Sequence, residues 1–278
     1  MYSSVLDRTE SFIKDITLRG SINKEAATGL VNDLSSSISE ENDEVIFHCI
    51  NEIREADRYL YTHSINVATL NVLMGIWLGL SDEQNKKLVK IGLMHDMGKL
   101  RLPQDIINKP GKLSDREFNI VKNHPINSYN MLVEIGEFDK DVLEAVKFHH
   151  ERENGSGYPN RLQSSQIPLF AKITAISDVY DAMISKRCYK EPVSPFDVLE
   201  MLSTNKFSNL DFKLVNKFLE VVPMLLMRKP FVLSDGNIGV VVYIRKDNYR
   251  YPVVKVNDRL VVTDEKCRCI SVYSPNIG

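Results

Sequence analysis

Hydrophobic residues recur at helical spacing through about the first 210 residues, and short polar segments interrupt them. Residues 81–84 and 114–117 have the sequence of capping boxes, and Ser194 is followed by a proline at the first helical position. The same periodicity predicts a helix over about residues 54–78. The larger part of the chain is therefore predicted to be mainly α.

The pattern changes from about Phe231 onward, where runs of β-branched residues are separated by short turn sequences. The turns are Asp235-Gly236, Lys246-Asp247-Asn248 and Asn257-Asp258. We expect a small antiparallel β appendage, which could cover the helical bundle, mediate a homodimer or do neither. The predicted segments are residues 1–55, 56–222 and 223–278.

Residues 1–55 contain three amphipathic stretches, at residues 5–16, 23–38 and 41–53. Each has the apolar stripe of a surface helix. They are expected to form N-terminal helices that pack on the main helical domain, which occupies residues 56–222.

Composition narrows the class of protein. With 43% hydrophobic and 26% charged residues in 278, the chain resembles an ordinary soluble globular protein. A net charge of -2 gives no general basic field for duplex nucleic acid, so a phosphate-binding site must be local. The apolar runs are too short to span a membrane, and the N-terminus lacks the order of a signal peptide. We expect a cytoplasmic protein with no membrane partner.

Five of the six histidines lie where helices or helix junctions would direct them inward. His63 shares a helical stripe with Leu70, and His95 shares one with Leu88. A single histidine is usually structural, but a cluster of imidazoles in a helical core would be costly to leave unpaired. The pattern indicates a transition-metal site built from His63, His95, His124, His149 and His150.

His149 and His150 are adjacent, so on a helix their side chains would diverge by about 100°. Either one of them is structural, or the two serve different metals. We expect each to bind a different ion.

Carboxylates usually complete such a site, and two are well placed. Asp96 follows His95 directly, and Asp178 lies on a small-residue helix face with Ala171 and Ala175. We favour Asp178 as a ligand, because an unpaired aspartate inside a helix is unfavourable. Asp181, one turn further, could instead hold a metal-binding histidine or fix Arg187.

These residues stand in motifs with a recognisable order: "HSINVA" from His63, "HDMGK" from His95, "HP" at His124, "HHERENGSGYP" from His149 and "ISDVYDAMISKRCYK" from Ile176. The series resembles the HD-GYP family, a branch of the HD metal-dependent phosphohydrolases that hydrolyses the bacterial messenger cyclic di-GMP. The resemblance covers about residues 57–205 and implies an HD-domain-like helical bundle.

The resemblance also implies a ligand set for two divalent transition metal ions, with Asp96 as their bridge. Family members with a third metal carry a Glu where this chain has Tyr59, so two metals are expected. Iron and manganese suit imidazole and carboxylate ligands best, and zinc and cobalt are alternatives. The implied ligands are His63, His95, Asp96, His124, His149, His150 and Asp178.

For the substrate, the resemblance implies that Lys99 reaches a phosphate and acts in catalysis with Asp96. The other expected substrate-binding residues are Gly157, Tyr158, Pro159, Asp181, Arg187 and Lys190. A face of Tyr158 is expected to receive a guanine by stacking. The alternatives are an ordinary surface turn at residues 155–159 and solvated cations at the basic positions. Asn154 and Cys188 depart from the residues common in the family, which affects substrate detail rather than metal binding.

The expected function is a cyclic di-GMP phosphodiesterase that opens the ring to linear pGpG through a metal-bridging hydroxide, with further cleavage to GMP left open. One alternative keeps the chemistry but changes the substrate to a hybrid GMP-AMP cyclic dinucleotide. The other is a catalytically idle receptor for a cyclic dinucleotide.

Overall fold

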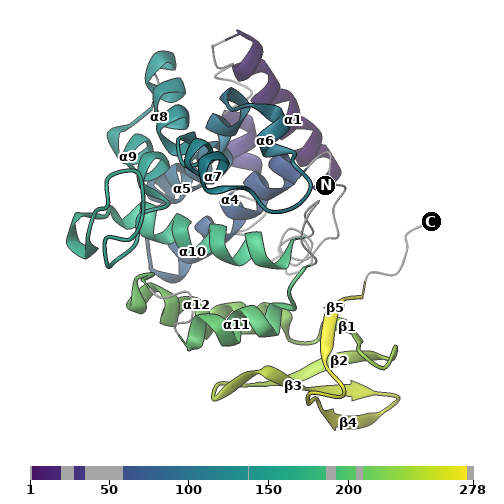
Figure 1. The fold of residues 1–278 in the computed structure, drawn as a ribbon. Coiled ribbons are helices and arrows are strands. Elements are labelled where there is room, and N and C mark those ends of the chain that lie inside the picture. Colours follow the sequence, from purple (N-terminus) through teal and green to yellow (C-terminus); the bar gives the residue numbers. More distant parts are fainter. Residues whose placement is uncertain are drawn as a thin grey trace.

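The computed structural model describes residues 2–19, 28–34, 59–136, 138–185, 192–204 and 209–273. Helices dominate it, and a small antiparallel sheet follows at the C-terminal side, which confirms the predicted fold class. Figure 1 shows this sheet at one end of the molecule, with α11 (Pro195–Ser203) and α12 (Phe212–Leu226) between it and α10 (Leu169–Ile184). The other α-helices with assigned bounds are α1 (Tyr2–Arg19), α4 (Tyr59–Trp77), α5 (Asp82–Met94), α6 (Gln104–Ile107), α7 (Asp115–Val121), α8 (His124–Ile135) and α9 (Lys140–Phe148). Two short 3₁₀ helices are η2 (Met97–Arg101) and η3 (Ser164–Gln166).

The predicted helix starts agree with the structure. Ser81 and Ser114 each accept a hydrogen bond from the third residue of their helix, and both capping boxes are complete. Helix α11 begins at Pro195 as expected, but the Ser194 side chain makes no capping hydrogen bond. Its hydroxyl is buried without a hydrogen bond. The fixed φ of the proline is therefore the start signal that operates there.

Helix α4 is the central element of the bundle and contacts α1, α5, α10 and α12. It approaches α5 closely at Gly92, where an added Cβ would lie 2.3 Å from Cα of Ala68. Most of α4 is buried, including the polar residues Asn66 and Asn71 and the predicted ligand His63. Buried polar side chains need partners inside the protein. Helix α4 can therefore place a functional side chain such as His63 in the interior.

The sheet has the strand order β4-β3-β2-β1-β5, and all neighbours are antiparallel. Asn257 and Asp258, at the predicted turn between β3 and β4, both have positive φ, as a tight hairpin requires. Asp197 of α11 forms ion pairs with Arg250 and Arg268, which join the sheet to the helices. The strands are β1 (Pro230–Leu233), β2 (Ile238–Arg245), β3 (Asn248–Val256), β4 (Arg259–Val262) and β5 (Cys269–Val272).

The N-terminal helix α1 packs against α4, and residues 28–34 form a further helical turn segment with buried Leu30 and Leu34. The third predicted amphipathic stretch, residues 41–53, lies outside the described residues. Helix α12 ends at Leu226, beyond the boundary predicted at residue 222. The division into three segments stays a prediction.

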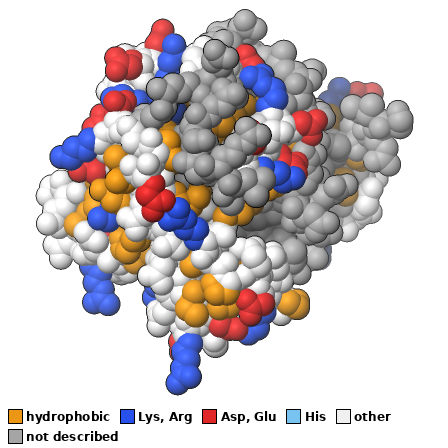
Figure 2. Space-filling view, turned by 90° about the horizontal axis from the view of Figure 1, so that it is seen from above, with side chains coloured by type: hydrophobic (Ala, Val, Ile, Leu, Met, Phe, Trp, Pro, Cys, Tyr) orange, Lys and Arg blue, Asp and Glu red, His pale blue; other side chains and the backbone are white. Residues whose placement is uncertain are grey.

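The face drawn in Figure 2 carries basic and acidic side chains interspersed with hydrophobic ones. This mixture agrees with the near-neutral net charge of the sequence. Among the described residues, no helix has the length and apolar character that crossing a membrane requires.

Candidate metal centre

Five elements bring the seven predicted ligands together. His63 comes from the interior of α4 and Asp178 from the interior of α10, whereas the others stand at or just beyond helix ends. His150 is partly exposed, and the remaining six are buried. The residues at helix ends are His95 and Asp96 after α5, His124 at the start of α8, and His149 and His150 after α9.

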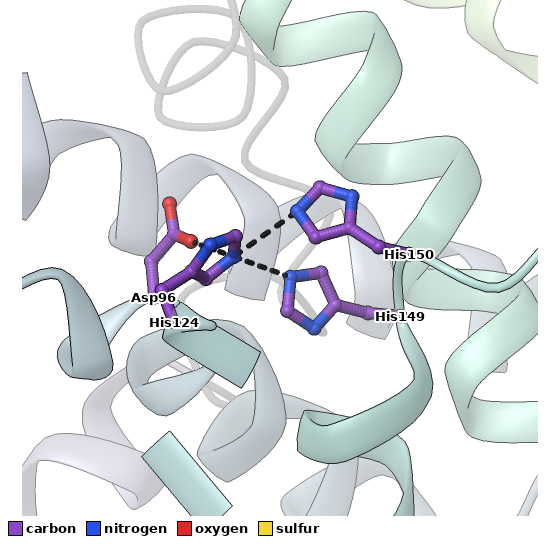
Figure 3. A group of neighbouring side chains, drawn as sticks. All are labelled: Asp96, His124, His149 and His150. Atoms are coloured by element: carbon purple, nitrogen blue, oxygen red, sulfur yellow. Dashed lines mark hydrogen bonds and ion pairs between the residues drawn. The ribbon is translucent and has the colours of Figure 1, made fainter. Parts of the chain in front are cut away.

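The candidate ligand atoms fall into two groups, and within each group they lie within 4.8 Å of one another. We call them the three-residue group (His63, His95 and Asp178) and the four-residue group (Asp96, His124, His149 and His150). Figure 3 shows the four-residue group, with the ring of His124 between Asp96 and the paired histidines. The arrangement offers two neighbouring positions for a metal ion.

Asp96 faces both groups. Its Oδ1 lies 3.1 Å from Nε2 of His124. Its Oδ2 lies 3.4 Å from Nε2 of His63 and 3.5 Å from Nε2 of His95. Both oxygens of one carboxylate are therefore directed at imidazoles of different groups.

Four of the imidazoles are oriented by a hydrogen bond at Nδ1. His95, His124 and His149 each place Nδ1 at 2.7–2.8 Å from the carbonyl oxygen three residues earlier. His63 places Nδ1 2.7 Å from Oδ2 of Asp181. A carbonyl oxygen and an ionised carboxylate oxygen can only accept, so Nδ1 is the donor in all four pairs, and in a neutral ring Nε2 then keeps its lone pair.

These lone pairs converge on one another. Nε2 of His63 lies 3.3 Å from Nε2 of His95, and Nε2 of His124 lies 3.4 Å from Nε2 of His149. In addition, Oδ1 of Asp96 is buried without a hydrogen bond. Buried acceptors that face each other are unfavourable unless a cation lies between them. The donor set therefore fits the divalent metal that an HD domain implies.

Electrostatics favour the protonation states that metal binding needs. Burial lowers the pKa of His95, His149 and His150, so these imidazoles are neutral at pH 7. Burial by itself would raise the pKa of Asp96, but the positive charge of Lys99 opposes this effect, and the pKa lies well below the usual value. Neutral imidazoles beside an ionised carboxylate are the ligand forms of these residues.

Lys99 lies in η2, and its ammonium forms an ion pair with Oδ2 of Asp96. About a fifth of its side chain (22%) is exposed, whereas Asp96 is almost fully buried. Lys99 therefore contacts the predicted ligand Asp96 and is also accessible to solvent, as a lysine that binds an anion must be.

The segment after the paired histidines folds back on them. Glu151 is 2% exposed, and its carboxylate accepts hydrogen bonds from the backbone amides of Asn160 and Leu162, at 2.6 and 2.9 Å. Gly157 is required there, because an added Cβ would lie 2.5 Å from the carbonyl oxygen of His150. Glu151 was missed as a site residue in the sequence, although its place directly after the two histidines was the available signal.

Tyr158 stacks on His150, with ring centroids 4.6 Å apart and an interplanar angle of 26°. One face of Tyr158 is therefore occupied by a predicted ligand. The ring holds His150 in place, and at most its other face is open to a guanine. Pro159 follows in the same turn, joined to Tyr158 by a cis peptide bond.

Asp181 is fully buried and hydrogen-bonds with His63, Asn66 and Ser185, so it orients a predicted ligand, which is one of the two roles that the sequence left open for it. Its burial speaks against the predicted contact with a substrate. His149 and His150 fall in the same group, which favours one shared ion over the two predicted ones. Nδ1 of His150 also lies 3.9 Å from Oδ2 of Asp178 in the three-residue group. The assignment of the two histidines to different ions stays a prediction.

Some predicted residues cannot be placed. Arg187 and Lys190 lie outside the described residues. Tyr59 begins α4, but its side chain is likewise not described. Their roles stay predictions, as do the ligand roles of the clustered residues.

Comparison with known proteins defines the class. The sequence profile of the HD domain family matches residues 48–235, so the chain belongs to the HD domain family. The relatives include the protein named cyclic di-GMP phosphodiesterase PA4108 of Pseudomonas aeruginosa, which is 31% identical over 246 residues. The match spans 88% of this chain and 59% of that protein.

Within this family, relatives named cyclic di-GMP phosphodiesterases support the HD-GYP branch that the motifs of the chain predict. RpfG of Xanthomonas campestris, named a cyclic di-GMP phosphodiesterase response regulator, is 42% identical over 121 residues, which are 41% of this chain and 30% of RpfG. A protein named 3′3′-cGAMP-specific phosphodiesterase 2, from Vibrio cholerae, is 33% identical over 68% of this chain and 36% of its own length. The chain thus spans less than two thirds of these relatives.

A solved structure has the same fold. Bd1817, an HDG"Y"P protein from Bdellovibrio bacteriovorus, superimposes with a TM-score of 0.64 at 18% identity, over 79% of this chain and 69% of that protein. At this identity the likeness establishes the fold alone.

Proposed function

We propose that this chain is a divalent-metal-dependent phosphodiesterase that hydrolyses cyclic di-GMP to linear pGpG. The observation that carries the proposal is the convergence of imidazole Nε2 atoms and carboxylate oxygens that lack protons between them. Such a buried set has no evident structural use, because well-packed hydrophobic residues would stabilise the core at lower cost.

We assign the three-residue group and the four-residue group to one ion each, shared through Asp96. Imidazoles mixed with carboxylates suit iron or manganese, with zinc or cobalt as alternatives. When bound, two divalent ions supply Lewis acidity, which favours deprotonation of a water and neutralises charge on a phosphodiester.

The residues of the chain supply orientation and charge. Asp96 holds its oxygens toward both groups, and Lys99 presents an ammonium at the exposed edge of the cluster. An anionic phosphodiester is attracted to this ammonium, which also stabilises the charge that develops as water adds to phosphorus. The P–O3′ bond then breaks, the 3′ oxygen takes up a proton, and a 5′-phosphate remains on the linear product.

The choice of cyclic di-GMP rests on relatives that carry this name, among them PA4108 and RpfG. Gly157, Tyr158 and Pro159 line the proposed substrate side beside His150, and Arg187 and Lys190 are proposed to bind its phosphates. A second candidate substrate is 3′3′-cGAMP, because three relatives from Vibrio cholerae are named phosphodiesterases specific for it. The proposal includes a cytoplasmic location and a homodimer, for which the sheet is one candidate interface.

The test is to load the purified chain with Mn²⁺ or Fe²⁺ under reducing conditions and to incubate it with cyclic di-GMP, 3′3′-cGAMP and cyclic di-AMP. Chromatography of the products separates pGpG from GMP. We expect pGpG from cyclic di-GMP at the highest rate. Faster turnover of 3′3′-cGAMP would select the second candidate, and no turnover with both metals confirmed by elemental analysis would contradict an enzyme.

The idle receptor is distinguished by variants. A receptor needs no activated water, so it would keep binding and signalling after His95→Ala. The phosphodiesterase is expected to lose hydrolysis in that variant, as measured by product release.

A further inference from the structure

The chain leaves the α-helical path between two predicted ligands. Helix α5 ends at Met94, and Asp96 has φ -102° and ψ 0°, outside the α region. The amide of Lys99 donates to the carbonyl of Asp96, at 3.0 Å, instead of to that of His95. In a continued α-helix the carbonyl of His95 would accept from Lys99, and the amide of Gly98 would donate to Met94. The change of helix type therefore releases one acceptor and one donor in a buried place.

Ser128 of α8 satisfies both released groups with one hydroxyl. Its Oγ donates to the carbonyl oxygen of His95 at 2.8 Å and accepts from the amide of Gly98 at 2.7 Å. The side chain is fully buried. Buried backbone groups that lose their partner are costly, so this hydroxyl is part of what makes the turn stable.

The turn and α8 are in direct contact at this point. A Cβ added to Gly98 would lie 2.1 Å from the carbonyl oxygen of His124 and 2.5 Å from the amide nitrogen of Ser128. Glycine thus lets the two segments meet, and the serine hydroxyl joins them. Such a close contact leaves the two segments little room to move relative to each other.

That separation matters because each segment carries a member of the four-residue group. Ser128 lies one helical turn after His124 on the same face of α8. Asp96 lies inside the turn that Ser128 binds, and its Oδ1 is 3.1 Å from Nε2 of His124. A displaced turn would move Asp96 away from His124 and would carry Lys99 with it.

We infer that Ser128 is a positioning residue for the metal centre: its hydroxyl fixes Asp96 relative to His124 and thereby sets the affinity of the four-residue group for a divalent ion. The inference rests on the proposed metal centre. It deepens that proposal by adding a residue that touches neither metal nor substrate.

The experiment is a titration of the metal-free 278-residue chain with Mn²⁺, followed by electron paramagnetic resonance of free Mn²⁺. Ser128→Ala removes the hydroxyl and keeps the Cβ, and we expect affinity at one of two sites to fall about tenfold, as loss of partners that orient ligands typically does. Ser128→Thr retains the hydroxyl and is expected to restore the wild-type affinity.

A matched control is Thr69→Val in α4. Thr69 is also buried, but its hydroxyl donates only to the carbonyl oxygen of Ile65 in its own helix. Thr69→Val loses a buried hydroxyl but leaves the turn that carries Asp96 unchanged. Its Mn²⁺ affinity is therefore expected to equal that of the wild type. Thermal unfolding of all variants shows the loss of stability that each substitution causes.

The outcomes separate the two proposals. No Mn²⁺ binding by the wild type would overturn the metal centre itself. Binding by the wild type with equal affinity in Ser128→Ala, or an equal loss in Thr69→Val, would overturn the role of Ser128 alone. If Ser128→Ala does not fold, Ser128→Cys replaces it, because a thiol is a weak hydrogen-bonding group. That variant is expected to bind Mn²⁺ more weakly than the wild type, and equal binding overturns the inference.

Discussion

The two groups of candidate ligands are built in different ways. The three-residue group takes His63 and Asp178 from the interiors of long helices and only His95 from a helix end, and a buried carboxylate, Asp181, orients His63. The four-residue group stands at helix ends and turns, where main-chain carbonyls orient His124 and His149. Ligands in helix interiors are fixed by the phase of the helix, whereas ligands at helix ends depend on the contacts that hold each turn.

The difference has a consequence for mutation. The carboxylate that orients His63 can be removed by substitution, but a main-chain carbonyl cannot. The four-residue group is therefore vulnerable through the side chains that hold its turns, which are Ser128, Glu151 and Tyr158.

The largest effect is expected where the groups meet, at Asp96. Asp96→Ala removes the carboxylate that faces both groups, so hydrolysis should fall by about 10³-fold or more, and bound metal should fall from two ions toward one or none. Turnover assays and elemental analysis measure the two effects. Asp141→Ala, at an exposed carboxylate paired with Lys87, is the control and should change neither. Full activity in Asp96→Ala would remove Asp96 from the centre.

The next largest effect should be confined to the three-residue group. Asp181→Asn keeps the shape of the side chain but removes the charge that His63 contacts, so we expect about 10- to 100-fold weaker binding of one ion. Mn²⁺ titration should show one weakened site and one unchanged site. Equal weakening of both sites would show that the groups do not act separately.

Glu151→Gln tests the turn that carries His150. An amide has one acceptor oxygen in place of two, so one of the amides of Asn160 and Leu162 would face an NH₂ group. We expect a loss of about 1–3 kcal/mol in the free energy of unfolding, measured with denaturant, together with a higher KM. Glu153→Gln, in the same segment, is the comparison, because Glu153 pairs with Lys172 instead of holding the turn. An unchanged stability in Glu151→Gln would contradict the assigned role.

The smallest effect is expected at Tyr158. Tyr158→Leu removes the ring that stacks on His150, at a cost of about 0.5–1.5 kcal/mol, or roughly a twofold to thirteenfold loss in kcat/KM. Tyr158→Phe keeps the ring and should lose less. If both variants lose the same amount, the phenol hydroxyl matters and the stacking does not.

Much of the fold was predictable because its signals are local. The capping residues Ser81 and Ser114, the helical periodicity around His63 and the Asn257-Asp258 turn all act within a few residues of the chain. Ser194 shows the limit of such signals, because the helix starts where predicted while the expected side-chain cap is absent.

The sequence by itself determined which side chains could form a metal centre, since histidine and aspartate at inward helical positions require partners wherever the helices pack. Only the tertiary structure decided how they are grouped and held. Asp181 meets His63 across 118 positions, and Ser128 meets His95 across 33. His149 and His150 join His124 in one group because α8 and α9 pack against each other. Contacts between distant segments produce no periodic pattern of residues along the sequence. The spacing of hydrophobic and polar residues therefore indicated the ligands but not the residues that position them.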